Sequence, residues 1–456
     1  MSYESFLASK APRPVASGLD VVPDLNPRLF PHQRDCVEFG LRQGRFGLFL
    51  DTGLGKTLCQ LEWSKHAAAA TNGSALILTP LAVAAQIVRE GRQFGYEVRQ
   101  ITDQSDAGPG INVCNYDRLQ LIDPDEFGAV ALDESSILKS FNGKTTRALI
   151  AAFAGHRFRM AATATPAPND HMELGTHAEF LGVMSATEML MRFFINDTAT
   201  ASQSWRLKRH GEAAFWEWMV SWARMAETPA DLGYDASSYV LPPLCVERHR
   251  AAGDVRAPAG ELFAADVSAT TMHQVKRETA EARAAMVAEM VNGNDRPWVV
   301  WCDTDYEADA LVKVIPDARE VRGSHTPKQK EGTLAAFASG SLRVLISKPV
   351  ICGFGLNWQH CSDMAFVGRS FSYEAWYQAV RRCWRFGQKK PVACHIIVAE
   401  GEDQIGRVID RKSEDHARMK RAMADAMRRA TSSAAEIKVP YRPTHLMEAP
   451  AWLSVA

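Results

Sequence analysis

The segment spanning residues 49–57, with the sequence FLDTGLGKT, limits the possible fold more than any other part of this chain. It predicts an apolar strand, a tight glycine loop and the first turn of a helix, which together form a phosphate-binding loop. Glycines let successive backbone N–H groups approach phosphate oxygens. We therefore expect Lys56 to reach the β- and γ-phosphates of ATP, and the Thr57 hydroxyl to hold Mg²⁺. The residues expected to surround the phosphates are Thr52, Gly53, Leu54, Gly55, Lys56 and Thr57.

An acidic pair later in the chain favours nucleotide hydrolysis. Asp133 and Glu134 directly follow an apolar stretch at residues 129–132 that is typical of a strand. Leu50 stands where the full Walker A pattern has its first glycine, so the loop taken alone also fits a structural glycine turn. The combination of a phosphate loop with an acidic pair at the end of a strand favours ATP binding and hydrolysis over that alternative.

The chain is long enough for two or three domains, because single cores rarely grow past about 250–300 residues. Short apolar strands alternate with helical stretches in two separate regions, which predicts two α/β domains with parallel sheets. The expected strands are residues 46–50, 75–79, 111–115, 130–133 and 159–163 in the first region, and 298–302, 318–321, 343–347, 363–367 and 395–398 in the second. We expect a flexible segment at 1–24, a first lobe at 25–190, a Trp-rich helical linker at 191–250, a second lobe at 251–435 and a tail at 436–456.

The Trp-rich segment has two possible interpretations. Phe215, Trp218, Met219 and Trp222 follow a helical spacing and share one face. This face would pack onto a neighbouring lobe, or it would offer a stacking platform for exposed bases. We favour the packing interpretation.

A cluster of arginines in the second region predicts that this lobe completes the site. If residues 373–388 are helical, Gln378, Arg382 and Arg385 share one face. A guanidinium from a second domain can neutralise the charge that develops on the γ-phosphate during phosphoryl transfer. The alternative is a solvated surface patch, which the two aromatic residues among the arginines make less attractive.

Composition excludes several classes of protein. The formal net charge is −1, so any surface that binds nucleic acid must be local. None of the 9 cysteines forms a CxxC pair, which argues against a zinc site or a disulfide framework and favours reduced thiols in a cytosol. The first fifteen or so residues lack the apolar core of a signal peptide, and no run is long enough for a membrane span. We expect a cytoplasmic monomer.

Seven short motifs resemble, in order, those of the superfamily-two helicases, and within them the Swi/Snf-like ATPases. Together with a Q motif at 29–33, they cover roughly residues 29–410. The seven are motif I at 51–57, motif Ia at 78–80, motif Ib at 115–116, motif II at 133–136, motif III at 163–166, motif V at 353–357 and motif VI at 378–388. The compact length and the Trp-rich linker are similar to helicases of bacteriophages and prophages. The chain departs from the family at Ser135 and Ser136, at Ala162 and Ala164, and at Arg381.

The resemblance implies roles for individual residues. Gln33 would read adenine, Asp133 would bind Mg²⁺, Glu134 would activate the attacking water, and Gly355 would lie at the nucleotide. The nucleic acid would cross both lobes opposite the ATP cleft. The candidate contacts are Thr79, Pro80, Asn115, Arg118 and Lys139 in the first lobe and Arg322, Ser347 and Asn357 in the second. Taken alone, Arg118 or Lys139 would be an ordinary solvated charge.

These observations predict an ATP-dependent translocase or helicase of nucleic acid. The resemblance implies that it moves along or remodels DNA, favoured over RNA, and we expect forked or branched DNA to be preferred. One alternative is the motor subunit of a restriction or defence complex, which would need a separate nuclease. Another is a slow nucleotide-dependent switch or loader that docks a partner. Replication, recombination or defence proteins are the expected classes of protein partner.

Overall fold

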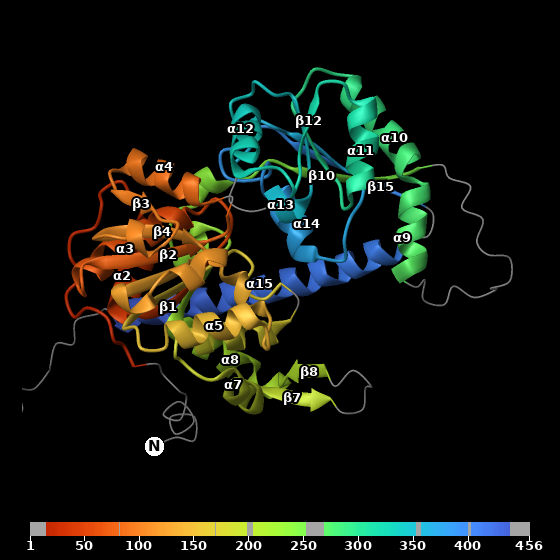
Figure 1. Cartoon of the computed structure of the whole chain (residues 1–456). Helices are drawn as coiled ribbons and strands as arrows, with labels where there is room; N and C mark the ends of the chain where they lie inside the picture. The colour runs from red at the N-terminus through yellow and green to blue at the C-terminus, as the bar shows by residue number, and fades with distance from the viewer. Residues whose placement is uncertain are drawn as a thin grey trace, which may run out of the picture.

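The computed structural model describes residues 15–437 apart from Ala82, Asn169, 198–203, 252–268, 353–356 and 400–402. The described residues form two α/β lobes, and a long C-terminal helix runs along both of them (Figure 1). Each lobe is built on its own parallel sheet. This arrangement confirms the expected fold class of two tandem RecA-like domains.

The first lobe contains a seven-stranded parallel sheet with the order β3-β4-β2-β5-β6-β1-β9. Its strands are β1 (Arg45–Leu50), β2 (Ser74–Thr79), β3 (Val98–Gln100), β4 (Gly110–Asn115), β5 (Ala129–Asp133), β6 (Phe158–Ala162) and β9 (Ala223–Ala226). The central strands are buried on both faces, which is why the sequence shows them as continuous apolar runs. The carboxyl ends of parallel strands lie at the same edge, so the loops after β1, β2 and β5 meet there.

Helices cover this sheet, and a small hairpin extends from it. The helices are α2 (Pro31–Gln43), α3 (Lys56–Ala69), α4 (Ala84–Phe94), α5 (Lys144–Ala152), α6 (Leu174–Phe180), α7 (Ala186–Phe193) and α8 (Glu212–Trp222). Strands β7 (Phe194–Asp197) and β8 (Ser204–Leu207) form the antiparallel hairpin. Helix α3 begins at Lys56, directly after the glycine loop, as the sequence predicts.

The second lobe contains a six-stranded parallel sheet with the order β10-β15-β14-β11-β13-β12. Its strands are β10 (Leu244–Arg250), β11 (Trp298–Trp301), β12 (Ala318–Val321), β13 (Val344–Ser347), β14 (Asp363–Phe366) and β15 (Val392–Val398). The helices are α9 (Ala269–Glu278), α10 (Ala280–Asn292), α11 (Asp305–Val314), α12 (Pro327–Ala338), α13 (Pro349–Cys352), α14 (Tyr373–Val380) and α15 (Asp403–Ile437). Helices α10 and α11 pack on one face, and α12, α13 and α14 pack on the other.

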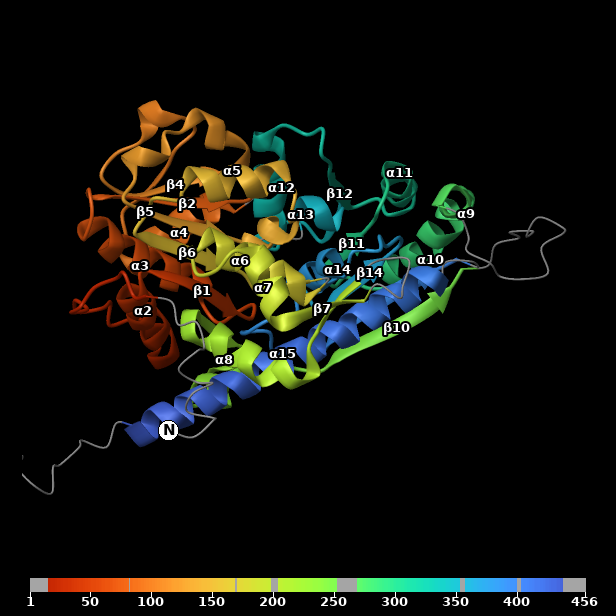
Figure 2. The same cartoon turned by 90° about the horizontal axis from the view of Figure 1, so that it is seen from below.

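The expected linker and the C-terminal helix both join the lobes. Residues 223–226 add strand β9 beside β1, and residues 244–250 add the edge strand β10 beside β15. Helix α15 belongs to the second half of the chain, but it packs on α8 and β9, and Met419 and Met427 are buried in the core of the first lobe. Figure 2 shows β10 and α15 running beside each other, and Arg248 of β10 pairs with Asp410 of α15 at 2.6 Å.

The aromatic face of α8 is structural. Phe215, Trp218, Met219 and Trp222 are buried, and Trp218 stacks on Phe193 with ring centroids 5.3 Å apart. Bases cannot reach these buried rings, which confirms the packing interpretation. Among the described helices, none is long and apolar enough to cross a membrane.

Candidate active site

The loop between β1 and α3 requires glycine at two positions. Gly53 and Gly55 have φ values of +94° and +82°, in the left-handed region that favours glycine. A Cβ atom on Gly55 would lie 2.1 Å from Nε2 of Gln33, so a side chain would also displace that amide. The Lys56 ammonium donates hydrogen bonds to the carbonyl oxygens of Leu50, at 2.9 Å, and Asp51, at 3.4 Å. These contacts fold the lysine back over its own loop.

The loop fits a bound nucleotide. The hydroxyl oxygen of Thr52 is buried without a hydrogen-bond partner, so a polar ligand group would satisfy it. Lys56 and Thr57 open the helix α3, where backbone N–H groups are free to bind phosphate. A cation, a hydroxyl and free amides together form a donor set for phosphate and Mg²⁺.

The acidic pair lies at the end of β5, beside this loop. Asp133 accepts hydrogen bonds from Nε2 of Gln60, at 2.7 Å, and from the hydroxyl of Thr79, at 3.0 Å. Glu134 has a φ of +51°, and it is the one non-glycine residue with a positive φ in the described ranges. Such a conformation is strained and concentrates at functional sites.

Burial is the main influence on the pKa values of the acidic pair and of Lys56. It raises the pKa of Asp133, which the hydrogen bonds from Gln60 and Thr79 partly offset. Burial also raises the pKa of Glu134, which the Lys56 ammonium partly offsets, and burial lowers the pKa of Lys56 itself. Lys56 and the two carboxyl groups therefore act on each other directly inside a buried site.

The second lobe brings two arginines to the same site. Helix α14 ends at Val380, so Arg382 and Arg385 lie on the turns that follow it rather than on one helical face. Burial and the neighbouring Arg385 lower the pKa of Arg382 to about 10, and Glu134 opposes this shift. Burial also lowers the pKa of Arg385, which Glu90 of α4 opposes most strongly and Glu134 more weakly. The negative charge of Glu134 in the first lobe therefore acts on both guanidinium groups.

A chain of contacts connects Glu134 to Arg382 across the lobes. The hydroxyl of Thr163 donates to Glu134 at 3.3 Å and accepts from the backbone N–H of Thr165 at 3.1 Å. The Gln378 amide reaches the hydroxyl of Thr165 at 3.5 Å, and its oxygen accepts from Arg382 at 2.8 Å. Thr163 and Thr165 thus link the acidic residue of one lobe to the arginine of the other.

A second cluster between the lobes was not expected from the sequence. Asp51 pairs with Arg381 at 2.6 Å and with Lys420 of α15 at 3.1 Å, and the hydroxyl of Tyr377 donates to it at 2.6 Å. Burial alone would raise the pKa of Asp51, but Arg381 and Lys420 hold it well below its ordinary value. The cluster borders a cavity of about 510 Å³ that extends between the phosphate loop and the second lobe.

Two further residues of the expected nucleotide site have distinct placements. Gln33 is buried, and its amide donates to the carbonyl of Leu54 at 3.1 Å, so it supports the glycine loop directly. Gly355 lies outside the described residues. Reading of adenine by Gln33 stays a prediction.

The candidate nucleic-acid contacts fall into two groups. Pro80, Asn115, Arg118 and Asn357 line a cavity of about 760 Å³ between the lobes, together with α4 and α12. The other four make contacts inside the protein. Thr79 bonds Asp133, Ser347 bonds the carbonyl of Val321, Lys139 pairs with Glu374 of α14 at 2.5 Å, and Arg322 pairs with Asp309 and Glu320.

Comparison with known proteins gives distant similarities. No model of a protein family matches the chain. The chain is similar to putative protein p41 of Acyrthosiphon pisum secondary endosymbiont phage 1, with 23% identity over 474 residues, 88% of this chain and 98% of that protein. It is also similar to the structure of the Sulfolobus solfataricus SWI2/SNF2 ATPase core in complex with dsDNA, with 15% identity, a TM-score of 0.41, and coverage of 92% of this chain and 98% of that one. At these identities neither similarity assigns the chain to a family.

Proposed function

We propose that the chain is a nucleic-acid-dependent ATPase that uses ATP hydrolysis to move along or remodel DNA, with forked or branched DNA preferred. The observation that carries this proposal is the single buried cluster formed by both lobes. The first lobe supplies Lys56, Asp133 and Glu134, and the second supplies Arg382 and Arg385. An acidic pair facing a lysine and two arginines is the set of charges that phosphoryl transfer needs.

Each residue has a role in this reaction. Lys56 and the backbone N–H groups of the loop bind the phosphates of the substrate ATP, and Glu134 accepts a proton from the attacking water. Thr57 and Asp133 would hold Mg²⁺, which supplies positive charge to the phosphate oxygens when bound. Arg382 and Arg385 neutralise the charge that develops on the γ-phosphate.

The division of the site between two lobes couples chemistry to movement. The arginines belong to the second lobe, so hydrolysis requires that the lobes be closed on each other. The contact between Gln378 and Thr165 and the pairing of Asp51 with Arg381 join the lobes at the same place. Loss of the γ-phosphate removes the charge that attracts the arginines, and this allows the lobes to separate.

The cavity of about 760 Å³ is the proposed path of the nucleic acid. It lies between the lobes, so a strand bound there touches both and responds to their movement. Asn115 has a buried side-chain oxygen without a partner, and Arg118 brings a cation to the wall. With a net charge of −1, we expect few phosphate contacts and a shallow salt dependence, near 0.9 per contact for duplex DNA.

The test is the ATP turnover of the full chain without polymer and with single-stranded DNA, duplex DNA, forked DNA and RNA in parallel. We expect stimulation by DNA, most strongly by forked or branched DNA. Turnover that no polymer stimulates would favour the switch or loader alternative. Stimulation by RNA but by no DNA would refute the choice of DNA and leave the ATPase assignment intact.

A further inference from the structure

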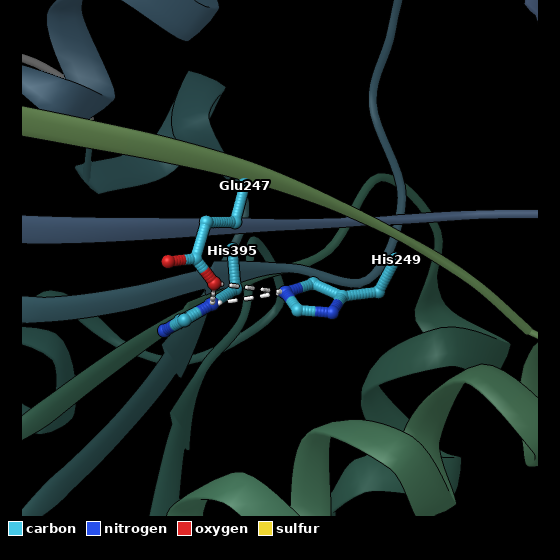
Figure 3. A group of neighbouring side chains, drawn as sticks. All are labelled: Glu247, His249 and His395. Carbon is cyan, nitrogen blue, oxygen red and sulfur yellow. Dashed lines mark hydrogen bonds and ion pairs between the residues drawn. The ribbon is translucent and has the colours of Figure 1, made fainter.

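Three side chains converge on one face of the second sheet, where β10 forms its edge. Glu247 and His249 are two residues apart on β10, so they point to the same face of the sheet. His395 of β15 is the direct partner of Glu247 in the parallel register. Figure 3 shows the carboxylate and the two imidazole rings directed toward one another from these neighbouring strands.

The distances among the three side chains match the spacing of ligands around one metal ion. Nε2 of His249 lies 3.0 Å from Nδ1 of His395, and an oxygen of Glu247 lies 3.7 Å and 3.5 Å from these two nitrogens. Tetrahedral zinc has bonds of about 2.0–2.1 Å, which places its ligand atoms about 3.3 Å apart. The observed separations lie on both sides of this value, so small rotations of the side chains would complete the geometry.

We propose that Glu247, His249 and His395 bind one divalent transition-metal ion, and that Zn²⁺ is the ion that fits best. Two imidazoles and one carboxylate suit zinc, whereas Mg²⁺ and Ca²⁺ prefer oxygen ligands only. The side chain of Glu247 is 58% exposed, so solvent can reach the ion. Three protein ligands with an open fourth position leave room for water or for a ligand from outside.

The surroundings favour a bound cation. Arg296 is a positive charge near His395, but it pairs with Asp363 at 3.1 Å, and the Glu247 carboxylate pairs with the two histidines. Trp298 stacks on the ring of His395 with centroids 5.7 Å apart and holds the imidazole in place.

The alternative is a simple hydrogen bond between the two imidazoles, which the distance of 3.0 Å also allows. In that arrangement one ring donates to the other, Glu247 is an exposed neighbour, and no metal binds. Cys245 is a further possible ligand, because it is exposed and lies two residues before Glu247 on the same face of β10. Metal titration separates these possibilities.

A metal here would fasten the edge strand β10 to β15. Strand β10 directly follows the segment that leaves the first lobe, so its attachment holds the second lobe to that segment. The proposal is independent of the nucleotide site, which lies at the lobe interface. The absence of CxxC pairs argued against a zinc site, but the ligands proposed here come from strands far apart in the sequence and include no required cysteine.

The experiment is calorimetric titration of Zn²⁺ into the metal-stripped, nucleotide-free full chain, with Co²⁺ absorption as a probe of tetrahedral coordination. We expect one site that His395→Ala and His249→Ala each weaken by about a hundredfold or more, because loss of an outer-shell partner alone costs 10–100-fold. Glu247→Gln should weaken it as well. His210→Ala is the matched control, since His210 is exposed and distant in sequence from β10 and β15, and it should leave the site unchanged.

A second readout keeps the test independent of folding defects. Zn²⁺ should raise the melting temperature of the wild type and of His210→Ala, but not that of His395→Ala. Circular dichroism confirms that each variant is folded before titration. Zinc binding that is equal in wild type and His395→Ala, binding lost only in Cys245→Ser, or octahedral Co²⁺ spectra in the wild type would each overturn the proposal.

Discussion

Removing the carboxylate of Asp51 should loosen the contact between the lobes. Asp51→Asn keeps the shape of the side chain but leaves the Arg381 guanidinium and the Lys420 ammonium without their shared anion. The side chains are only 5% exposed at Arg381, 9% at Asp51 and 12% at Lys420, so solvent screens the remaining charges weakly. The substitution therefore leaves two like charges side by side in a buried site.

The expected cost follows from this burial. Breaking a buried ion pair by removal of one partner costs about 3–5 kcal/mol, because the remaining charge is uncompensated. Lys420→Met should cost less, because Asp51 and Arg381 still form a neutral pair. The double variant Asp51→Asn/Lys420→Met should be more stable than Asp51→Asn alone, because it removes one of the two unpaired cations.

Hydrogen exchange of the amides of α15 measures this contact locally. A loss of about 3 kcal/mol lowers the protection of these amides by about a hundredfold or more, since each 1.4 kcal/mol is tenfold. Amides in β4, far from the cluster in the first sheet, serve as the internal reference. Unchanged protection of α15 in Asp51→Asn would refute the reasoning, and so would a larger loss in Lys420→Met than in Asp51→Asn.

Three further predictions concern the first lobe. Glu134→Gln should abolish ATP turnover but retain ATP binding, as measured by steady-state hydrolysis and by titration, because it removes the base and leaves Lys56 in place. Trp218→Ala should lower the unfolding free energy by about 3–5 kcal/mol without a specific loss of DNA binding, as measured by denaturation and a binding assay. Hydrogen bonds from His66, Tyr96 and a backbone N–H overcome the effect of burial and lower the pKa of Glu62 from 4.5 to about 2. The stability advantage of the wild type over Glu62→Gln should therefore be full above pH 5 and shrink as the pH falls toward 2, as measured by denaturation at each pH.

The parts of the fold that were predictable are those with strong local patterns. The strands β1, β2, β4, β5 and β6 lie within one residue of their expected positions, because strands buried on both faces form continuous apolar runs. Strand β9 was not predicted, because it is short and contains the charged residue Arg224. The guanidinium of Arg224 lies 3.4 Å from the ring centroid of Phe39, so the charge is accommodated by a contact that the local sequence does not reveal.

The candidate site shows the same division. The glycine loop, the acidic pair and the arginines were predictable because each occurs in one short segment. The end of α14 at Val380 was not predictable, because the first glycine after it is Gly387. The turns between these residues are fixed by contacts such as the hydrogen bond that the backbone N–H of Trp358 donates to the Arg382 carbonyl at 3.0 Å. The contact of Lys420 with Asp51 in the phosphate loop was not predictable either, because nothing in the local sequence of the basic helix α15 indicates that it reaches the first lobe.

The contribution of the second lobe to hydrolysis is tested most directly by the ATP turnover of Arg385→Ala. This variant should lose about a thousandfold in turnover with saturating DNA, because an arginine that stabilises the transition-state charge is worth about 10³–10⁵. Its affinity for nucleotide should change much less. Arg319→Ala, an exposed arginine of the same lobe, is the matched control and should turn over normally. Normal turnover in both Arg385→Ala and Arg382→Ala would contradict a site completed by the second lobe.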